Sequence, residues 1–402
     1  MGKHGKLTKA QRSYRKYSSS DYLISSTENS NPAEDEGSQQ NGESDQEHDA
    51  QITDVTSGRG PASGEEPLFN KHALYQRAVQ KPKGDISYLQ KFFLNYVGGR
   101  TPLHLREDFC GTALICAEWV RGDTRRTAVG LDLDEEALTW GLQHNVVKAG
   151  SDAYNRVHLF CGDVINPISK ARPKQADPKA LSHASNGVVA QKDMPEKRDV
   201  DESETLEEKG GAEIGQATGL AKDIQAADVI CAFNYSCCCL QKRSDLVRYF
   251  KEALKAISTE GGIFAMDLYG GASSECALKL RRRFDDFQYT WEQEDFDVIT
   301  RTTRISLHFR LKKNQGVLRH AFSYHWRLWT LPEVRECLEE AGFQSIHFWI
   351  KEMPDLQGRG HEESDVSDSN AKYEEVHSFS QEDAWNAYVV AVAPPKSTPI
   401  RG

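Results

Sequence analysis

Between residues 68 and 392, segments with the apolar pattern of a strand alternate with segments that have the apolar spacing of a helix. Apolar runs typical of strands occur near 102–106 and at 127–132, 157–161, 227–233 and 263–268. Helical spacing of apolar residues occurs at 71–97, 114–120, 135–148 and 245–257. Strands that alternate with helices in this way predict an α/β fold: a three-layer sandwich in which a mostly parallel sheet carries helices on both faces. One domain accounts for all of these elements.

The last third of the chain departs from this alternation. Residues 298–311 and 317–329 are rich in strand-forming residues, and the segment Lys-Lys-Asn-Gln-Gly between them has turn chemistry. We therefore expect an added antiparallel β-hairpin. A helix at 332–341 and strands at 346–350 and 388–392 are expected to complete the fold.

Three stretches, at 1–66, 169–222 and 355–373, lack a sustained apolar period and are too polar to build a core. We interpret them as a disordered tail, a disordered insertion and a polar loop. The domain itself is expected at 67–395, with a C-terminal tail at 396–402. Residues 1–16 carry lysine and arginine but no carboxylate. This basic segment is either a contact for nuclear import or RNA, or simply a solvated tail.

Composition and charge make several classes of protein less consistent with this sequence. The 402 residues carry a formal net charge of −10, which argues against a surface built mainly for nucleic acid. We find no apolar run long enough for a membrane span and no secretory signal, so we expect a protein of the cytoplasm or nucleus. The nine cysteines are expected to be reduced thiols. Adjacent cysteines at 237–239 cannot easily face one metal ion, so no metal site is predicted.

Candidate binding chemistry follows the first three strands. Gly111, flanked by small residues, lets the backbone approach a ligand closely before a helix begins. Asp132 ends the second strand about twenty residues later, where a carboxylate can accept hydrogen bonds from ribose hydroxyls. The alternative is that Asp132 only caps the next helix. Gly162-Asp163 places a further carboxylate after the third strand, within reach of an adenine amine. Together these positions predict a nucleoside-containing ligand.

The segment Glu-Asp-Phe-Cys-Gly-Thr-Ala at 107–113 resembles motif I of the class I S-adenosylmethionine-dependent methyltransferases, an acidic residue followed by three alternate glycines. Phe109 and Ala113 replace the first and third glycines. A nicotinamide-dependent oxidoreductase would be expected to keep all three. The resemblance implies a seven-stranded Rossmann-like sheet of order 3-2-1-4-5-7-6, with strand seven antiparallel, and S-adenosyl-L-methionine as cofactor. Either Glu107 or Asp108 would meet the methionine amino group. The implied cofactor-binding residues are Glu107, Asp108, Cys110, Gly111, Thr112, Asp132, Leu133, Gly162, Asp163 and Asn234.

Acceptor-side residues are expected after strands four and five and on the hairpin. Catalytic candidates are Asp267 as a base, His325 as an alternative base, and Tyr235. Candidate substrate contacts are Tyr75, Tyr269 and Arg327. Asn234 and Tyr235 are equally compatible with a turn and a core aromatic, and His325 with an exposed strand residue. The segment Asn234-Tyr235-Ser236 lacks the two prolines usual in methyltransferases that act on adenine or glutamine, so that specificity is not implied.

These features predict an enzyme that moves a methyl group by in-line displacement to an acceptor. The hairpin favours a small-molecule acceptor, because in the small-molecule methyltransferases that this region resembles such a hairpin covers the acceptor. The basic segment at 1–16 favours a protein or RNA acceptor. A contrasting hypothesis, motivated by the irregular motif I, is a non-catalytic protein that keeps the cofactor and recruits a partner.

Overall fold

The computed structural model describes residues 70–174, 224–312, 315–353 and 372–394. The predicted tails at 1–66 and 396–402 lie outside the described residues, as do most of the predicted insertion and polar loop. Described backbone continues past the expected start of the insertion at Ser169, where β4 (Arg172–Lys174) pairs antiparallel with β3 (Val157–Cys161).

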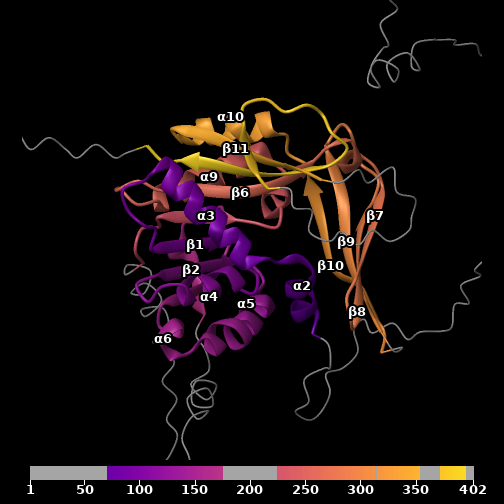
Figure 1. The fold of residues 1–402 in the computed structure, drawn as a ribbon, viewed down its shortest axis with the longest axis horizontal. Coiled ribbons are helices and arrows are strands. Elements are labelled where there is room, and N and C mark those ends of the chain that lie inside the picture. Colours follow the sequence, from indigo (N-terminus) through magenta and orange to yellow (C-terminus); the bar gives the residue numbers. More distant parts are fainter. Residues whose placement is uncertain (1–69, 175–223, 313–314, 354–371, 395–402) are drawn as a thin grey trace, which may run out of the picture. The chain divides into compact units, whose positions relative to one another are not determined.

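A nine-stranded mixed sheet forms the centre of the described domain (Figure 1). The strand order is β12-β11-β13-β6-β5-β1-β2-β3-β4. Neighbours from β6 to β3 are parallel, and β13 is antiparallel to both β6 and β11. Without the short edge strands β4 and β12, this is the predicted order 3-2-1-4-5-7-6. The remaining bounds are β1 (His104–Asp108), β2 (Thr127–Asp132), β5 (Val229–Ala232), β6 (Ile263–Gly270), β11 (Ser345–Glu352), β12 (Glu374–Val376) and β13 (Trp385–Val392).

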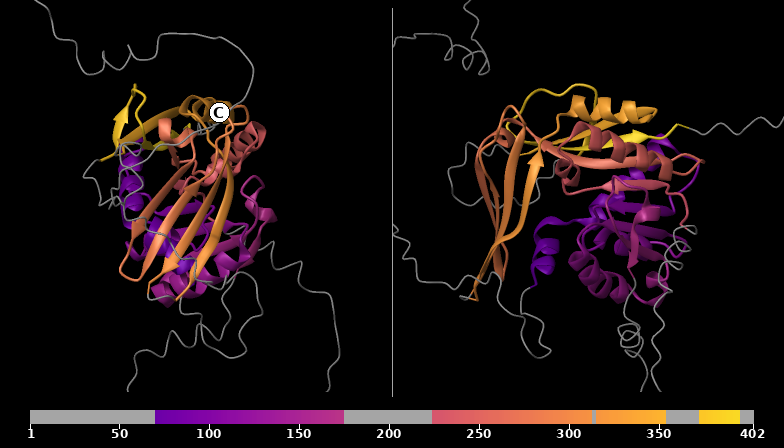
Figure 2. Two further views of the ribbon diagram at one scale, coloured as in Figure 1. Left: turned by 90° about the vertical axis from the view of Figure 1, so that its right-hand side faces the viewer. Right: turned by 180° about the vertical axis from the view of Figure 1, so that it is seen from behind.

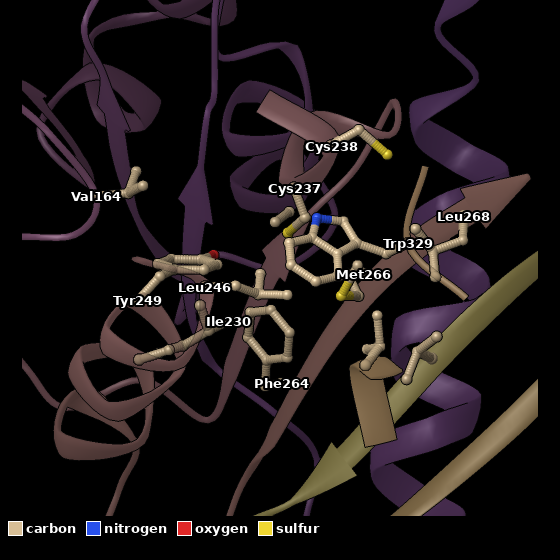
Figure 3. Close-up of a cluster of buried hydrophobic side chains, with 14 of the residues drawn as sticks. Val164, Ile230, Cys237, Cys238, Leu246, Tyr249, Phe264, Met266, Leu268 and Trp329 are labelled. Carbon is tan, nitrogen blue, oxygen red and sulfur yellow. The ribbon is translucent and has the colours of Figure 1, made fainter. Parts of the chain in front are cut away.

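Helices cover both faces of this sheet, so its central strands are apolar on both sides. One face packs against α3 (Pro82–Tyr96), α4 (Leu114–Arg121), α5 (Glu135–Gly141) and the π-helical turn Leu142–Val146. The other packs against α9 (Arg243–Ala256) and α10 (Leu331–Ala341). Figure 3 shows Leu246 and Tyr249 of α9 beside Ile230 and Phe264 of the sheet. The shorter helices are α6 (Ser151–Tyr154) and the 3-10 turns Val147–Ala149, Ile168–Lys170, Ser236–Cys239 and Ala272–Glu275.

Local signals set the ends of these helices. The predicted helical region 71–97 is two helices, α2 (Lys71–Val79) and α3, because Pro82 begins the second. Thr330 and Glu333 form a reciprocal capping box at the start of α10, and Gly342 ends it with φ of 104°. No helix in the described ranges has the length and apolar character needed to cross a bilayer.

A separate four-stranded antiparallel sheet stands beside the central one (Figure 2). Its order is β10-β9-β8-β7, with bounds β7 (Leu278–Arg283), β8 (Phe287–Gln293), β9 (Thr302–Leu311) and β10 (Val317–Arg327). The predicted hairpin is confirmed as β9 and β10, but β7 and β8 were not predicted. Helix α2 lies next to this sheet, where Arg77 forms an ion pair with Asp286 at 2.6 Å.

Candidate functional site

The turn after β1 has the backbone of a three-glycine motif although it contains one glycine. Phe109, Gly111 and Ala113 have φ of 54°, 50° and 53°, the left-handed region that glycine adopts most easily. These are the three glycine positions of the motif that this segment resembles. A Cβ atom built on Gly111 would meet no heavy atom within 4 Å, so the backbone there faces open space.

Residues from other elements hold this turn in place. Gln76 of α2 donates a hydrogen bond from Nε2 to Thr112 Oγ1 at 2.7 Å. Asn145, which is buried, donates from Nδ2 to the Thr112 carbonyl oxygen at 2.8 Å. Gly141 packs so closely on Thr112 that a Cβ atom there would collide with its backbone. Neither Gln76 nor Asn145 was predicted, because both act only through tertiary contact.

Cys110 supports the turn from within the core. Its thiol is buried and lies where a Cβ atom on Gly130 would crowd it, at 2.9 Å. Burial raises the pKa of the Cys110 thiol, which opposes the thiolate form. A small side chain that fills space beneath the turn therefore explains this cysteine.

Asp132 comes together with Gly111 as predicted. Its Oδ2 accepts a hydrogen bond from the Gly111 backbone N–H at 2.6 Å, and its Oδ1 accepts one from Asp134 at 2.8 Å. The cap of α5 is Asp134, which accepts from the Ala137 N–H at 3.0 Å, so the capping alternative for Asp132 is excluded. Burial raises the pKa of Asp132. Leu133 follows with 68 % of its surface exposed.

Asp163 lies at the same edge of the sheet, after β3. The Gly162 N–H donates to the Asp132 carbonyl oxygen at 2.8 Å, which joins the two strand ends. The carboxylate of Asp163 accepts from the Ile165 N–H at 3.1 Å within its own turn. Gly162 is required by close packing, because a Cβ atom there would crowd Ala171 at 2.5 Å.

Glu107 and Asp108 point to opposite faces of β1. Asp108 is fully buried and accepts from Arg106 Nε at 2.7 Å and from the Tyr249 hydroxyl at 3.0 Å. Glu107 is 4 % exposed and accepts from the Cys116 N–H at 2.9 Å, in the first turn of α4. Burial raises the pKa of Glu107 to about 8. Since partners inside the fold occupy Asp108, Glu107 is the better candidate for a ligand contact.

The loop after β5 is held by the strand beside it. Asn234 and Tyr235 both have left-handed backbone, with φ of 61° and 59°. Their backbone N–H groups donate to the Asp267 carboxylate at 3.0 and 2.7 Å. Burial raises the pKa of Asp267 to about 7. The Tyr235 hydroxyl donates to Asn386 Oδ1 at 3.1 Å.

Five aromatic side chains pack against one another beside this loop. Ring centroids are 4.8 Å apart for Tyr235 and Tyr269, 5.9 Å for Tyr269 and Trp291, 5.6 Å for Trp291 and Trp326, and 5.2 Å for Trp326 and Tyr324. We call these five residues the aromatic group. Tyr269 and Tyr235 were predicted as site residues. Trp291 of β8 was missed, because its strand carries no recognisable motif.

Tyr75 of α2 reaches toward the same region. Its ring lies 5.0 Å from that of Phe322 in β10. Burial raises the pKa of Tyr75 well above its ordinary value, and nearby Tyr324 and Asp267 raise it further. A side chain from the helix that binds the Thr112 turn is therefore close to the acceptor-side candidates.

His325 and Arg327 are not brought to the aromatic group. His325 is exposed, whereas its neighbour Trp326 is buried, as strand alternation predicts. The Arg327 guanidinium donates to Glu333 at 2.8 Å and lies 3.9 Å from the centre of the Trp329 ring. Its contacts hold β10 to α10.

Asp85 of α3 is a site residue that the sequence did not reveal. Its Oδ1 accepts from the Tyr388 hydroxyl at 2.6 Å, and burial raises the pKa of Asp85 to about 6. The charge of Asp85 contributes to the raised pKa of both Glu107 and Asp267. An acidic residue in the first turn of a helix is common, and no pattern distinguished this one.

The described residues contain no group of three histidine, cysteine or acidic side chains placed to hold a metal ion. In the cysteine run, Cys237 and Cys238 are buried and Cys239 is exposed. The run forms a 3-10 turn whose first two side chains belong to the core (Figure 3).

No protein-family profile matches the sequence, and no curated protein matches it. Solved structures similar in fold include an S-adenosylmethionine-dependent methyltransferase from Clostridium acetobutylicum, at 14% identity over 80% of this chain and 97% of that one, with a TM-score of 0.44. CalS10, an amino pentose methyltransferase from Micromonospora echinaspora, shows 10% identity over 83% and 100% of the two chains, with a TM-score of 0.46. DesVI from Streptomyces venezuelae shows 12% identity over 80% and 96%, also with a TM-score of 0.46.

The strand order itself carries the assignment of the fold. Five parallel strands, a crossover at β1 and β5, and an antiparallel β13 inserted between β6 and β11 reproduce the sheet that the motif I resemblance implies. The described chain therefore has the fold of the class I methyltransferases, extended by a second, antiparallel sheet.

Proposed function

We propose that this protein is an S-adenosylmethionine-dependent methyltransferase that acts on a small molecule. The observation that carries the proposal is the turn at 109–113. Its three left-handed residues open the backbone at Gly111 to a ligand, and the same Gly111 N–H binds the carboxylate of Asp132. A nucleoside at the ends of β1, β2 and β3 needs such an arrangement.

The donor-side residues fit this cofactor in charge as well as in shape. Glu107 and Asp132 have no lysine or arginine ion-pair partner among the described residues. Buried carboxylates without a cation are costly, and a ligand that carries an ammonium and a sulfonium group would relieve that cost. Glu107 would bind the ammonium, Asp132 the ribose hydroxyls and Asp163 the adenine amine.

The bound cofactor supplies a methyl group already activated on sulfur. The task of the protein is to hold an acceptor in line with it and to exclude water, and orientation of this kind is worth about 7–11 kcal/mol. Helix α2 is suited to this role, because Gln76 binds the Thr112 turn while the Tyr75 ring packs against Phe322 of β10. Asp267 is placed to accept a proton from the acceptor.

The choice of a small-molecule acceptor rests on the second sheet. Strands β8 and β10 bring Trp291 and Trp326 against Tyr235 after β5 and Tyr269 near the end of β6, where an acceptor must meet the methyl group. Aromatic walls of this kind suit a compact ligand. A protein or RNA acceptor held by residues 1–16 is the competing proposal, and a chain lacking residues 1–66 would then lose acceptor methylation.

Calorimetry with S-adenosylhomocysteine tests the cofactor site. We expect saturable binding that Asp132→Ala weakens at least about 100-fold, since a buried charge-assisted contact is lost. Asp134→Ala is the matched control: it removes the α5 cap in the same loop and should leave binding nearly unchanged. Absence of binding in the unmodified chain, or equal binding by Asp132→Ala, would overturn the proposal.

Turnover separates an enzyme from a non-catalytic cofactor-binding protein. The chain is incubated with methyl-labelled S-adenosylmethionine and a cell extract, and the labelled products are divided by size. We expect label in the low-molecular-weight fraction. Binding of the cofactor without label in any fraction would favour the non-catalytic alternative.

A further inference from the structure

The aromatic group combines four separate parts of the chain on the acceptor side. Tyr235 follows β5, Tyr269 ends β6, Trp291 lies in β8, and Tyr324 and Trp326 lie in β10. Trp326 is 2 % exposed, and its indole N–H has no oxygen or nitrogen acceptor in the part of the chain that the structure describes. The other four rings are half-buried, so each keeps some surface open to a ligand.

Lysine and arginine side chains lie over aromatic rings in other parts of the described chain, but not over the rings of the aromatic group. Arg327 lies over Trp329 at 3.9 Å, Arg126 over Trp119 at 4.1 Å and Lys91 over Trp349 at 4.2 Å. Among residues 70–174, 224–312, 315–353 and 372–394, no lysine or arginine lies over a ring of the aromatic group. The half-buried rings of the aromatic group therefore have no cation–π partner within the described protein.

The carboxylate of Asp267, near the aromatic group, also lacks a cationic partner among the described residues. Asp267 accepts two backbone N–H groups but forms no ion pair with lysine or arginine in the described chain. The charge of Asp85 also raises the pKa of Asp267. Since carboxylates that are largely withdrawn from solvent are normally paired in proteins, a positive charge on the ligand would complete this side of the site. The ammonium group of the cofactor would pair with Glu107. The carboxylate of Asp267 is then left to pair with a positive charge on the acceptor.

We infer that the methyl acceptor is a primary or secondary amine that arrives as an ammonium ion, with the aromatic group binding the cation and Asp267 accepting its proton. This inference rests on the proposed methyltransferase function. It specifies the acceptor atom as nitrogen and the acceptor class as cationic.

The reaction balances with these residues. The ammonium ion gives one proton to the Asp267 carboxylate and becomes a neutral amine with a free electron pair. That pair forms the new N–C bond as the C–S bond breaks, and the bonding pair of the C–S bond stays on sulfur, which becomes a neutral thioether. The product is a methylated ammonium ion, and Asp267 releases its proton to water. A raised pKa of about 7 suits a group that takes up and releases a proton near neutral pH.

Oxygen, sulfur or carboxylate acceptors fit this environment less well. An acceptor that arrives as an anion, such as a carboxylate, would place a second negative charge beside Asp267, and like charges in a site shielded from solvent repel. A neutral alcohol, phenol or thiol would bring no positive charge for the rings and the carboxylate to bind. An ammonium acceptor instead gains from both the carboxylates and the rings. The same charges would bind the methylated product, which is also a cation.

A pair of probes that share a shape and differ in charge tests the inference. Choline carries a quaternary ammonium group, and 3,3-dimethylbutan-1-ol replaces its nitrogen with carbon. Calorimetry is performed on the full chain saturated with S-adenosylhomocysteine. We expect choline to bind about tenfold more tightly than the alcohol, in line with a partly desolvated cation–π site. Equal binding of the two probes would overturn the inference.

A matched pair of variants locates the binding site. Trp291→Leu should reduce the preference for choline at least about fivefold, whereas Trp291→Phe should retain most of it, since a ring remains. Trp140→Leu is the control, because Trp140 stacks on His144, outside the aromatic group. A preference for choline that survives Trp291→Leu would contradict the assignment. Failure of the unmodified chain to bind S-adenosylhomocysteine would instead refute the proposed function itself.

Discussion

The donor side and the acceptor side of the candidate site are built in different ways. Gly111, Asp132 and Asp163 each lie at or shortly after the carboxyl end of a parallel strand, so the order of the sheet alone brings them to one edge. The aromatic group instead needs two sheets to meet, because Trp291 and Trp326 come from the antiparallel sheet and Tyr235 and Tyr269 from the central one. Local backbone geometry defines the first half, and tertiary packing defines the second.

This difference predicts where substitutions act. Changes on the donor side should alter cofactor binding and leave acceptor preference intact, and changes on the acceptor side should do the reverse. Asp267 lies at the boundary, because its carboxylate holds the loop after β5, which carries both Asn234 and Tyr235. Three substitutions test the comparison, in decreasing order of expected effect.

Asp267→Asn should lower the rate of methyl transfer by about 10²–10⁴-fold, the usual contribution of a general base. The unmodified enzyme should gain activity as the pH rises through about 7, where the Asp267 carboxyl group loses its proton. That limb of the profile should vanish in the variant. The measurement is label transferred from S-adenosylmethionine to the small-molecule fraction of a cell extract, at a series of pH values.

Two observations keep this test independent of folding. Cofactor binding by Asp267→Asn should stay within about threefold of the original, because the amide that replaces the carboxylate keeps one oxygen to accept from the loop after β5. Asp134→Ala is the structural control: it removes the carboxylate that caps α5 and leaves Asp267 in place, so its pH profile should keep the limb near 7. A pH limb near 7 that persists in Asp267→Asn would assign the proton transfer to another group.

The contrast also explains which features could be predicted from the sequence. The parallel strands were predicted because apolar runs of a buried sheet are continuous, and Gly111 and Asp132 because their roles depend on the strands just before them. Strand β7 was missed, since its sequence Leu-Lys-Leu-Arg-Arg-Arg alternates with only half-buried apolar positions. Asp85 was missed because nothing in its own helix distinguishes it from an ordinary first-turn acid.

Two further features depend on the three-dimensional environment. The left-handed backbone at Phe109 and Ala113 could not be inferred from residue types, because neither residue favours it. In the structure the Phe109 ring packs against Tyr249 at 5.7 Å, and the fold around the turn fixes the strained conformation. The turn therefore keeps its left-handed backbone at Phe109 and Ala113, although both positions lack the glycine that the motif predicts.

Glu107→Gln tests whether ionisation of the buried Glu107 carboxyl group destabilises the chain when no cofactor is bound. The pKa of Glu107 is raised from 4.5 to about 8 by burial, so between these pH values the folded chain holds a proton that the unfolded chain has released. The contribution of Glu107 to stability must therefore fall as the pH rises through this window. The glutamine side chain of the variant cannot ionise and avoids this loss.

The free energy of unfolding of Glu107→Gln, taken relative to the original chain, should thus increase by about 2–4 kcal/mol between about pH 5 and about pH 8. Urea unfolding without cofactor measures it. A difference between the two chains that does not change with pH would mean that Glu107 titrates normally. On the acceptor side, choline preference should be unaffected by this substitution.

The smallest effect concerns the backbone of the turn itself. Ala113 and Ala117 are both fully buried, and both lose a methyl group when replaced by glycine. Ala117 lies inside α4, whereas Ala113 has φ of 53°, where an L-residue is strained by about 1–2 kcal/mol. Ala113→Gly should therefore destabilise the chain by about 1.5–3 kcal/mol less than Ala117→Gly, of which about 0.5–1 kcal/mol is the cost of glycine inside α4, in thermal or urea unfolding. A difference of no more than about 1 kcal/mol would show that Ala113 is unstrained, and the three-glycine geometry of the turn would then have no energetic basis.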